Sequence, residues 1–538
     1  MDETQYHIQR LGALKTERSN FDSQWEEAAA RIIPAHRNTF SGSRTVQGQK
    51  QNELQFDSTT SIAAQRFGSV MESLTVPQGS IWHLLKPTDP TLRRNRAVRA
   101  FFDELSEVLF NYRYRPVANF VGNVQQVFLG LGVYGNGTLY VDQPEREKGL
   151  RYRNIHLGEV YFVENHAGVI DTMYRCYSLS IRQIMERFGD KAPEEIKDAA
   201  KNPQMVDTKK DLLHVVAPRR DYIPGGLGQE NMPFKSCYYL IETKAKLEEG
   251  GYDSFPYPTA RYTQLPGECY GRGPAQWVLG AIKTLNEEKR TVLKQGHRVV
   301  DPVLLSHDDS NLGSFSLKAG ALNPGGINKD GKRMVDVLPT GNIAVGDKMM
   351  DMEKAIINDA FLITLFQILI DTPQMTATEV LERAREKGML LAPTAGRLQA
   401  EFLGPLIERE LTLLGRQGLM PRMPQILLEA AVEYRVEYDS PMSRMQRAEK
   451  AAGFMRALDV AANYAKMTGD VEALDHFNFD AAMPAILDIQ GSPVAWTRSE
   501  DEIAARRQAR AQQQQDAQMI EAAPAVAGLV KATGQGGA

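Results

Sequence analysis

Gly130, Gly132 and Gly135 stand in the segment GLGVYG and match the GxGxxG pattern of dinucleotide-binding loops. In those loops the glycines follow a strand and open a helix, because the helix N-terminus receives the pyrophosphate. Here the predicted order is reversed, with a helix over 119–129 before the glycines and the strand-like TLYV after them. We therefore interpret the segment as a helix-to-strand turn in which Gly135 and Gly137 supply positive φ angles.

A second glycine-containing segment, GINKDGK over 326–332, falls one residue short of the phosphate loop GxxxxGK[ST], because Arg333 comes next. The phosphate loop needs a Ser or Thr hydroxyl there to bind Mg²⁺, and arginine cannot coordinate a cation. The pattern instead favours a Gly-rich hairpin turn that exposes Lys329, Lys332 and Arg333. The segment therefore does not support ATPase activity.

Histidines and acidic residues give no metal or catalytic pattern. The nine histidines are scattered, with no HExxH motif, and the chain has no GxSxG nucleophile elbow. His307, Asp308 and Asp309 form the one tight polar cluster, but their spacing fits no EF-hand loop, and we interpret them as a solvated loop. The sequence predicts no catalytic residue, no cofactor and no metal, so we do not expect an enzyme.

Length and composition indicate a large soluble chain. Its 538 residues predict roughly three or four domains, and a net charge of −4 argues against a broad basic face for nucleic acid. No secretory signal opens the chain, and the longest apolar run, 360–370, is well short of the roughly 20 residues that span a bilayer. The cysteines show no CxxC spacing, which indicates a reducing compartment and no disulfide framework: Cys176, Cys237 and Cys269.

Helical and β-like patterns alternate along the first half of the chain. Over 6–33 the apolar spacing predicts two amphipathic helices, which Pro34 ends. Further helices are predicted over 58–74, 97–112 and 119–129. Short runs of β-forming residues predict strands at 138–141, 152–155, 160–164, 212–217 and 236–242. These elements predict a mixed α+β body.

The pattern changes after Pro256. Residues 275–298 predict a helix on the order of 36 Å long, followed by a compact insert rich in Gly, Asn and Asp over 299–346. A second helix is predicted over 347–363. After a break at 371–374, another helical stretch covers 378–419, punctuated by Pro393 and Pro405, and the last hundred residues predict Ala-, Met- and Gln-rich helices with a partly disordered end.

Several stretches, taken in order, resemble one known family. They are the opening helices that end at Ile33-Pro34, residues 56–85 with Trp82 and Leu85 in a W-x-x-L strand, LGVYGNGTLYV (131–141) with its GN-x-x-L-Y core, GECYGRGPAQWVLGAIKTLNE (267–287) with E-x-Y-G-R, and MTATEV (375–380). Together they resemble the portal, or head-to-tail connecting, proteins of short-tailed, podovirus-type tailed bacteriophages. The specificity lies in the order and spacing of these stretches, since none is a short catalytic signature.

The resemblance implies a fold and an assembly. The fold would be α+β and predominantly helical, with wing, stem, clip and crown regions, and a dodecameric ring of chains would surround a central channel. The implied regions are a wing at 1–267, stem helices at 268–298 and 347–371 around a clip at 299–346, a tunnel loop at 372–377, a return to the wing at 378–439, crown helices at 440–511 and a tail at 512–538.

The resemblance also implies a function and partners. The ring would sit at one capsid vertex, assembled in the host cytoplasm, and would conduct double-stranded DNA, without sequence specificity, during packaging and ejection. Its partners would be the terminase large subunit, the major capsid and scaffolding proteins, and the tail adaptor proteins, with no membrane. The alternatives are an internal scaffold or core protein of the capsid and a nucleotide-dependent packaging enzyme.

Particular residues follow from this interpretation. On the first stem helix, DNA-channel candidates alternate with Glu287 and Glu288, and solvated or intersubunit salt-bridged charges are an equal alternative for them. The candidates are Lys283, Lys289, Arg290, Lys294 and Arg298 for the channel, Thr372, Pro373, Gln374, Met375 and Thr376 for the tunnel loop, and Lys329, Lys332 and Arg333 for clip docking. Met349, Met350 and Met352 are interpreted as adaptable interface packing.

Overall fold

The computed structural model describes two units, Met1–Ser443 and Arg444–Ala538, and each is treated by itself. The described residues are 2–41, 48–89, 92, 95–145, 147–226, 228–306, 316–327, 329–339, 341–364, 393–430, 434–439, 441–468, 475–479, 482–483, 486, 502–510 and 512–513. The tunnel-loop candidates Thr372 to Thr376, the cluster at His307, Asp308 and Asp309, and most of the predicted tail lie outside them. The described chain is α+β with helix predominating, as predicted.

The N-terminal segment is one helix, α1 (Glu3–Ile32), and the prediction of two helices is wrong. The apolar pattern seemed broken because an arginine, Arg18, occupies a core position between Leu14 and Phe21. Its guanidinium lies 3.8 Å from the ring centre of Tyr161 and donates to the Leu157 carbonyl at 3.0 Å. A buried arginine with these partners continues the buried face of the helix, so no break is needed.

Three further helices share a core with α1. They are α2 (Thr59–Thr75), α3 (Arg96–Arg113) and α4 (Phe120–Tyr134). The predicted helix at 119–129 therefore runs five residues further and takes in Gly130 and Gly132. A Cβ at Gly132 would stand 2.7 Å from the Phe67 ring of α2, so the glycine permits the close approach of the two helices.

Gly135 ends α4 with a φ of +74°, as predicted for the turn. Gly137 does not share this conformation, so that part of the prediction is wrong. It lies inside strand β2, where a Cβ would stand 2.5 Å from the Val127 carbonyl oxygen. Its role is close backbone approach.

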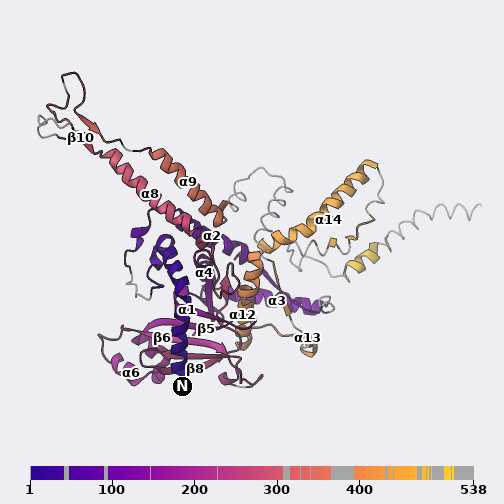
Figure 1. Ribbon diagram of the computed structural model, residues 1–538. Coiled ribbons are helices and arrows are strands. Elements are labelled where there is room, and N and C mark those ends of the chain that lie inside the picture. The colour runs from indigo at the N-terminus through magenta and orange to yellow at the C-terminus, as the bar shows by residue number, and fades with distance from the viewer. Residues whose placement is uncertain are drawn as a thin grey trace, which may run out of the picture. The chain divides into compact units, whose positions relative to one another are not determined.

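The largest sheet is an antiparallel meander in the order β4-β5-β6-β7-β8 (Figure 1). Helix α1 covers one face, and α5 (Ile181–Phe188) and α6 (Glu194–Ala200) cover the other. Neighbouring residues alternate between the two cores, with Leu212 facing α5 and Leu213 facing α1. The strands are β4 (Val160–Glu164), β5 (Ile170–Ser180), β6 (Lys209–Pro218), β7 (Phe234–Leu240) and β8 (Ala245–Tyr252).

Two smaller antiparallel sheets complete the body. One has the order β3-β2-β9, and the other pairs β1 with β12 from near the end of the first unit. Their strands are β1 (His83–Pro87), β2 (Asn136–Asp142), β3 (Arg151–Ile155), β9 (Thr259–Arg261) and β12 (Tyr434–Tyr438). The five strands predicted from the sequence are confirmed as β2, β3, β4, β6 and β7. Short 3-10 helices lie at Pro34–His36, Asn52–Leu54, Leu157–Glu159, Gly189–Lys191 and Gln229–Asn231.

A pair of helices projects from this body (Figure 1). The predicted helix at 275–298 is α7 (Pro274–Trp277) followed by α8 (Leu279–Val300), and α9 (Ile343–Ala360) packs beside α8. Helix α9 begins four residues before its predicted start, because the Asn342 side chain accepts the Ala344 N–H at 2.9 Å as an N-cap. Between them β10 (Leu304–Ser306) pairs with β11 (Val335–Val337) at the tip.

The chain returns to the body through residues 393–416. A π-helical turn at Gln399–Leu403 leads directly into α12 (Gly404–Arg416), so Pro405 does not interrupt the helix. The wider π turn accommodates the missing proline N–H. Helices α13 (Gln425–Ala430) and α14 (Pro441–Thr468) follow, and residues 502–510 are also helical. Helix α14 confirms helix in the predicted C-terminal region.

A buried ion pair joins the return helix to the body. Arg113 of α3 and Glu410 of α12 are both fully buried, and the Arg113 Nε donates to the Glu410 carboxylate at 2.9 Å. The Tyr152 hydroxyl donates to the same carboxylate at 2.5 Å. Burial and the neighbouring guanidinium hold the pKa of His83 far below its usual range, so its neutral Nδ1 accepts from Arg113 at 3.1 Å.

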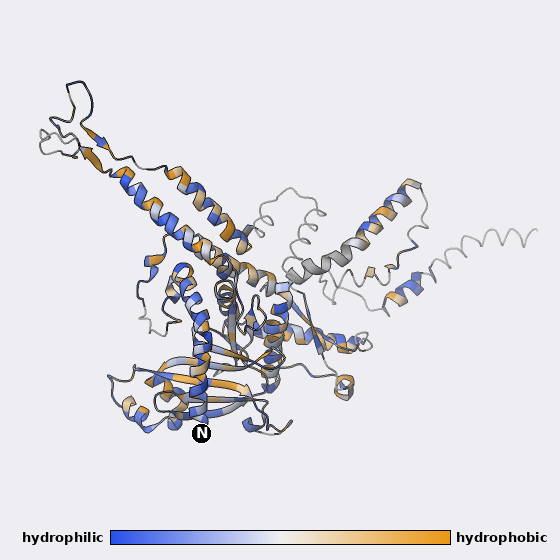
Figure 2. Ribbon diagram, in the orientation of Figure 1, coloured by the Kyte–Doolittle hydropathy of each residue, from blue (hydrophilic) through white to orange (hydrophobic). Residues whose placement is uncertain are grey.

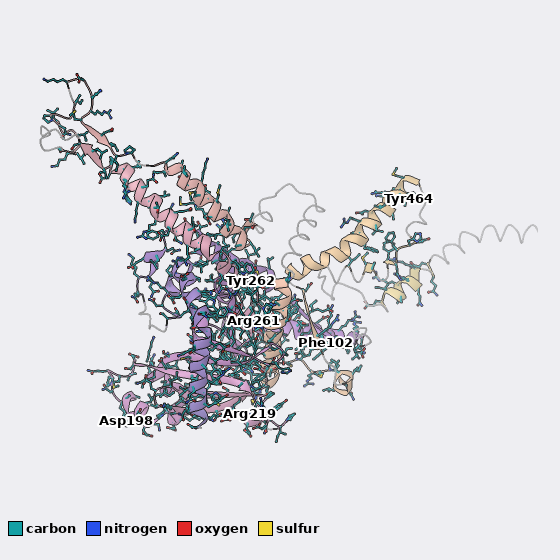
Figure 3. All side chains as sticks on the ribbon, viewed as in Figure 1. Phe102, Asp198, Arg219, Arg261, Tyr262 and Tyr464 are labelled. Atoms are coloured by element: carbon teal, nitrogen blue, oxygen red, sulfur yellow. The ribbon has the colours of Figure 1, made fainter. Side chains whose placement is uncertain are left out.

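A second arginine ties the return segment to the sheets. Arg261 of β9, labelled in Figure 3, is buried. Its guanidinium donates to both oxygens of Glu401, at 2.8 and 3.0 Å. It also pairs with Glu164 of β4 and donates to the Cys269 carbonyl at 3.0 Å. Residues far apart in sequence are thus held by one fork-shaped cation.

Candidate functional surfaces on the projecting hairpin

The hairpin formed by α8, the tip strands and α9 is anchored where two of the recognised motifs meet. Asn136 of the GN-x-x-L-Y core donates from Nδ2 to the Gly271 carbonyl at 3.0 Å, and its Oδ1 accepts the Gly271 N–H at 2.8 Å. A Cβ on Gly135 would stand 2.4 Å from the Gly273 nitrogen. The glycines let the two backbones touch, and the asparagine fastens them together.

The E-x-Y-G-R motif surrounds this joint. The Glu268 carboxylate accepts from Arg272 Nε at 2.9 Å and from Nη2 at 2.6 Å, which closes a bidentate pair across the turn. Tyr270 between them is buried against Trp25 and Phe162. The motif therefore fixes the point at which the chain leaves the body and enters α7 and α8.

Asn136→Ala is expected to lower the free energy of unfolding by about 2 kcal/mol, because it leaves buried backbone groups of Gly271 and Tyr134 unpaired. Urea denaturation followed by circular dichroism measures the change. Asn202→Ala, at an exposed asparagine, is the control and should shift stability by less than about 0.5 kcal/mol. Equal stability of the two variants would contradict the role of the joint.

Four of the five channel candidates lie on one face of α8. Lys283, Arg290, Lys294 and Arg298 are spaced by seven, four and four residues and span an arc of about 80°. Lys289 lies about 100° away from Arg290 around the helix, on a different face. The structure thus brings four candidates together and separates the fifth.

The two cations nearest the start of α8, Lys283 and Arg290, already contact side chains of the same chain. Lys283 Nζ lies 2.7 Å from a Glu27 carboxylate oxygen of α1. Arg290 lies 3.5 Å from Glu287 and 5.6 Å from the ring centre of Phe56. These two residues therefore fit the salt-bridge alternative better than a DNA contact.

The two cations nearer the end of α8 are exposed to solvent. Lys294 and Arg298 are exposed, and within the described residues neither lies within 4.0 Å of a carboxylate. Helix α9 packs on the opposite side of α8, where a Cβ on Gly346 would stand 2.6 Å from Val292. These two cations are free to meet a partner outside the chain.

Helix α9 carries an exposed apolar stripe. Val345, Met349, Met352 and Ile356 follow each other by four, three and four residues, and they are 55, 49, 69 and 49% exposed. Figure 2 shows hydrophobic residues at intervals along the hairpin. Met350, by contrast, is buried in the core of the first unit. Met349 and Met352 are therefore exposed, so their interface role stays a prediction, whereas Met350 packs within the chain and that part of the prediction is wrong.

The tip carries the predicted clip-docking residues on a turn. An isolated antiparallel bridge joins Ile327 to Arg333, and Gly331 between them has a φ of +77°. Lys329, Lys332 and Arg333 are all exposed. The turn leads into strand β11 and not into a helix, so the hairpin-turn interpretation is confirmed and the geometry of a phosphate loop is missing from this segment.

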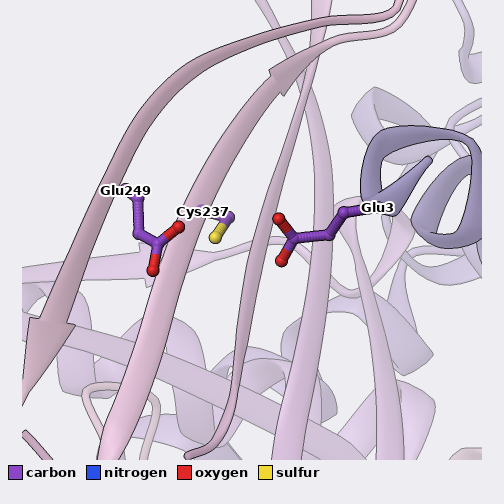
Figure 4. A group of neighbouring side chains, drawn as sticks. All are labelled: Glu3, Cys237 and Glu249. Atoms are coloured by element: carbon purple, nitrogen blue, oxygen red, sulfur yellow. The ribbon is translucent and has the colours of Figure 1, made fainter. Parts of the chain in front are cut away.

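One cluster in the body has the composition of a metal site. Ligand atoms of Glu3, Cys237 and Glu249 lie within 4.8 Å of one another (Figure 4). Lys246 Nζ lies 2.9 Å from Glu3, and Lys235 also reaches both carboxylates. Burial acts to raise the pKa of Glu3, but the two ammonium groups outweigh it and lower that pKa to about 2. The cluster is therefore an ion-pair network that fastens the start of α1 to β7 and β8.

This network predicts a pH dependence. Because the pKa of Glu3 is lower in the folded chain than its ordinary 4.5, its stabilising effect is complete above that value and is lost as the pH falls toward about 2. The difference in urea midpoint between the wild type and Glu3→Gln should be largest near pH 6 and should shrink steadily toward about pH 3. A difference that does not change with pH would contradict this assignment.

The three cysteines are free thiols in the structure, and burial raises the pKa of Cys237. Among the described helices, none is both long enough and apolar enough to cross a membrane. The sequence patterns did not reveal the Asn136 joint or the buried arginines, because no spacing rule marks a polar side chain that pairs with a distant backbone. The one available signal was the GN dipeptide beside a strand.

Comparison with known proteins identifies the family. The family model described as bacteriophage head to tail connecting protein matches residues 4–496, so the chain belongs to this family. The portal protein of Salmonella phage epsilon15 is 25% identical over 95% of this chain and 92% of its own length. A probable portal protein of Bordetella phage BPP-1 is 26% identical over the same shares. The resemblance read from the motifs is confirmed.

Proposed function

We propose that the chain is the portal subunit of a bacteriophage virion, assembled as a dodecameric ring at the capsid vertex where head and tail join. The observation that carries the proposal is the projecting hairpin, which exposes an apolar stripe on α9 and, among the described residues, leaves Lys294 and Arg298 of α8 without a carboxylate partner. In a closed ring each subunit presents one surface to a different surface of the next. An apolar stripe on α9 facing a neighbouring copy fits that arrangement.

The proposed regions follow the described elements. The sheets with α1 to α6 and the return helix form the wing (1–267 and 378–439), α8 and α9 the stem (268–298 and 347–371), and the tip strands the clip (299–346). The tunnel loop (372–377), crown (440–511) and tail (512–538) keep the boundaries expected from the family. The stem and clip assignments are supported by an antiparallel helix pair with a strand pair at its end.

Within this ring Lys294 and Arg298 are the best channel candidates, because they alone of the four aligned cations lack an intrachain partner among the described residues. Double-stranded DNA carries one charge per about 1.7 Å, and every cation that binds it releases counterions. Few open cations on a chain of net charge −4 favour loose contact, which lets DNA slide in packaging and ejection.

The clip turn is proposed as the docking surface for the terminase large subunit and later for tail adaptor proteins. Its exposed Lys329, Lys332 and Arg333 suit acidic partner surfaces. Val303, Leu317 and Leu322 of the tip are also more than half exposed, so the tip needs a covering partner or a neighbouring copy. Major capsid and scaffolding proteins would contact the wing.

Ring formation is tested by negative-stain electron microscopy with mass photometry of the purified chain. We expect rings with a central hole and a mass about twelve times the 60.1 kDa of one chain. Met349→Glu with Met352→Glu should give folded monomers, since it places charge in the apolar stripe, whereas Met205→Glu on the exposed body should leave rings intact. A wild-type monomer under all assembly conditions, or nucleotide hydrolysis by it, would contradict the portal assignment.

The channel assignment predicts an altered salt dependence of DNA binding. Lys294→Gln with Arg298→Gln should weaken ring binding to double-stranded DNA and flatten the slope of log affinity against log salt, because fewer counterions are released. The matched control is Lys283→Gln with Arg290→Gln, which removes two cations already held by the chain and should change the slope less. A larger change in the control would overturn the assignment.

A further inference from the structure

The body contains a polar cavity that the connector role does not use. It has a volume of about 400 Å³ and lies between the small sheet and the α5 side of the large sheet. Its lining combines four tyrosines and two carboxylates with four arginines: Arg151, Arg153, Arg175 and Arg187. The volume falls in the range of pockets that enclose small ligands. So many guanidinium groups around one cavity call for a compensating anion.

Arg175 forms the deep wall of the cavity. It is 5% exposed, and its Nε and Nη2 both donate to a single carboxylate oxygen of Glu159 at 3.0 Å. Its guanidinium lies 4.2 Å from the ring centre of Tyr177. A buried guanidinium normally uses its fork of five N–H groups on several acceptors. Arg175 also forms a side-chain hydrogen bond with Tyr257 of the cavity lining, so its fork is held in a fixed direction while some of its five N–H groups stay available to a ligand.

Arg187 of α5 is held in a similar way. Its Nη2 donates to the Tyr238 hydroxyl at 2.6 Å, and its guanidinium lies 4.5 Å from the centre of that ring. Tyr238 stacks on the buried His214 ring at 4.0 Å, and His214 Nδ1 lies 2.7 Å from the Tyr257 hydroxyl. Three aromatic rings thus fix the arginine before any ligand arrives, which reduces the entropy lost on binding.

Arg151 and Arg153 form the outer rim. They stand two residues apart on β3, so both side chains leave the same face of an edge strand. Both are exposed, and within the described part of the chain neither lies within 4.0 Å of a carboxylate. They are the unpaired charges of the cavity.

The carboxylates of the lining do not neutralise these arginines. Asp142 accepts from the Tyr140 hydroxyl at 2.7 Å and lies 3.7 Å from Arg409, a buried arginine outside the cavity lining. Glu145 is exposed at the rim. The charged side chains of the lining and their two pairing partners are five arginines and three carboxylates: Arg151, Arg153, Arg175, Arg187 and Arg409 against Asp142, Glu145 and Glu159. The group therefore carries an excess of two positive charges.

We propose that this cavity binds a phosphate monoester of about mononucleotide size. A phosphate monoester carries close to two negative charges near neutral pH and three strong acceptor oxygens, which matches the excess charge and the several guanidinium forks. A single carboxylate would be satisfied by one arginine and would leave the others unpaired. The proposal does not depend on ring formation, because every residue of the cavity comes from one chain.

The test is isothermal titration calorimetry of the full chain with adenosine monophosphate, adenosine and citrate as separate probes. The monophosphate should bind at least about tenfold more tightly than adenosine or citrate, because it alone joins the phosphate charge to a body that fills the cavity. Arg151→Gln with Arg153→Gln should weaken its binding about tenfold or more. Arg182→Gln, on an exposed arginine of α5 outside the cavity, should leave binding within about twofold.

The remaining outcomes overturn the proposal. Absence of monophosphate binding to the wild type, equal affinity for adenosine, or citrate binding as tightly as the monophosphate would each reject a phosphate site. Equal weakening in Arg182→Gln would show that the arginines act only through general charge. The urea midpoint of each variant confirms that it is folded, and mass photometry shows whether ring assembly is retained, so a failure here stays distinct from a failure of the portal proposal.

Discussion

The buried pair between Arg113 and Glu410 is the contact on which the rest of the first unit depends. Its two charges are 297 positions apart in the sequence and both are fully buried, so folding must bring α3 and α12 together before either charge can leave water. Breaking such a pair leaves one uncompensated charge and costs about 3–5 kcal/mol. Tyr152 and His83 add acceptors and donors from two different sheets. The hairpin between these segments is thereby confined at both its ends.

The body and the hairpin differ in how their apolar residues are used. In the body, sheets and helices bury them on two sides, as Leu212 and Leu213 show. On α9 the inner residue Ile357 is fully buried while Met352 is 69% exposed. An apolar helix face that stays in solvent is unusual for an isolated chain and is typical of a surface that contacts another molecule. In the proposed ring, a neighbouring copy would cover the exposed face of this helix pair.

Apolar periodicity was enough to predict most helices and the five strands, because burial of one face sets the spacing. It failed where polar groups occupy core positions, as at Arg18, which made one helix resemble two. It also missed β5 and β8, because charged residues interrupt the apolar pattern of both strands: the buried Arg175 in β5, and Lys246, Glu248 and Glu249 in β8. That Lys283 and Lys294 lie on one face of the helix follows from helix geometry. The ion pair between Lys283 and Glu27 could not be predicted from the sequence, because it joins two helices that only the tertiary fold brings together. No pattern in the sequence gathers the four cavity arginines, since they come from two strands and a helix.

The joint between Gly135 and Gly273 has a mechanical meaning beyond its packing. Helix α8 has 22 residues and acts as an arm of roughly 33 Å. A tilt of about 5° at the base would displace its far end by about 3 Å, close to the width of a hydrogen-bonded contact. Two backbones in direct contact leave no side chain between them to compress, and Asn136 removes the remaining freedom to slide. The direction in which the arm points is thus set by the smallest residues in the chain.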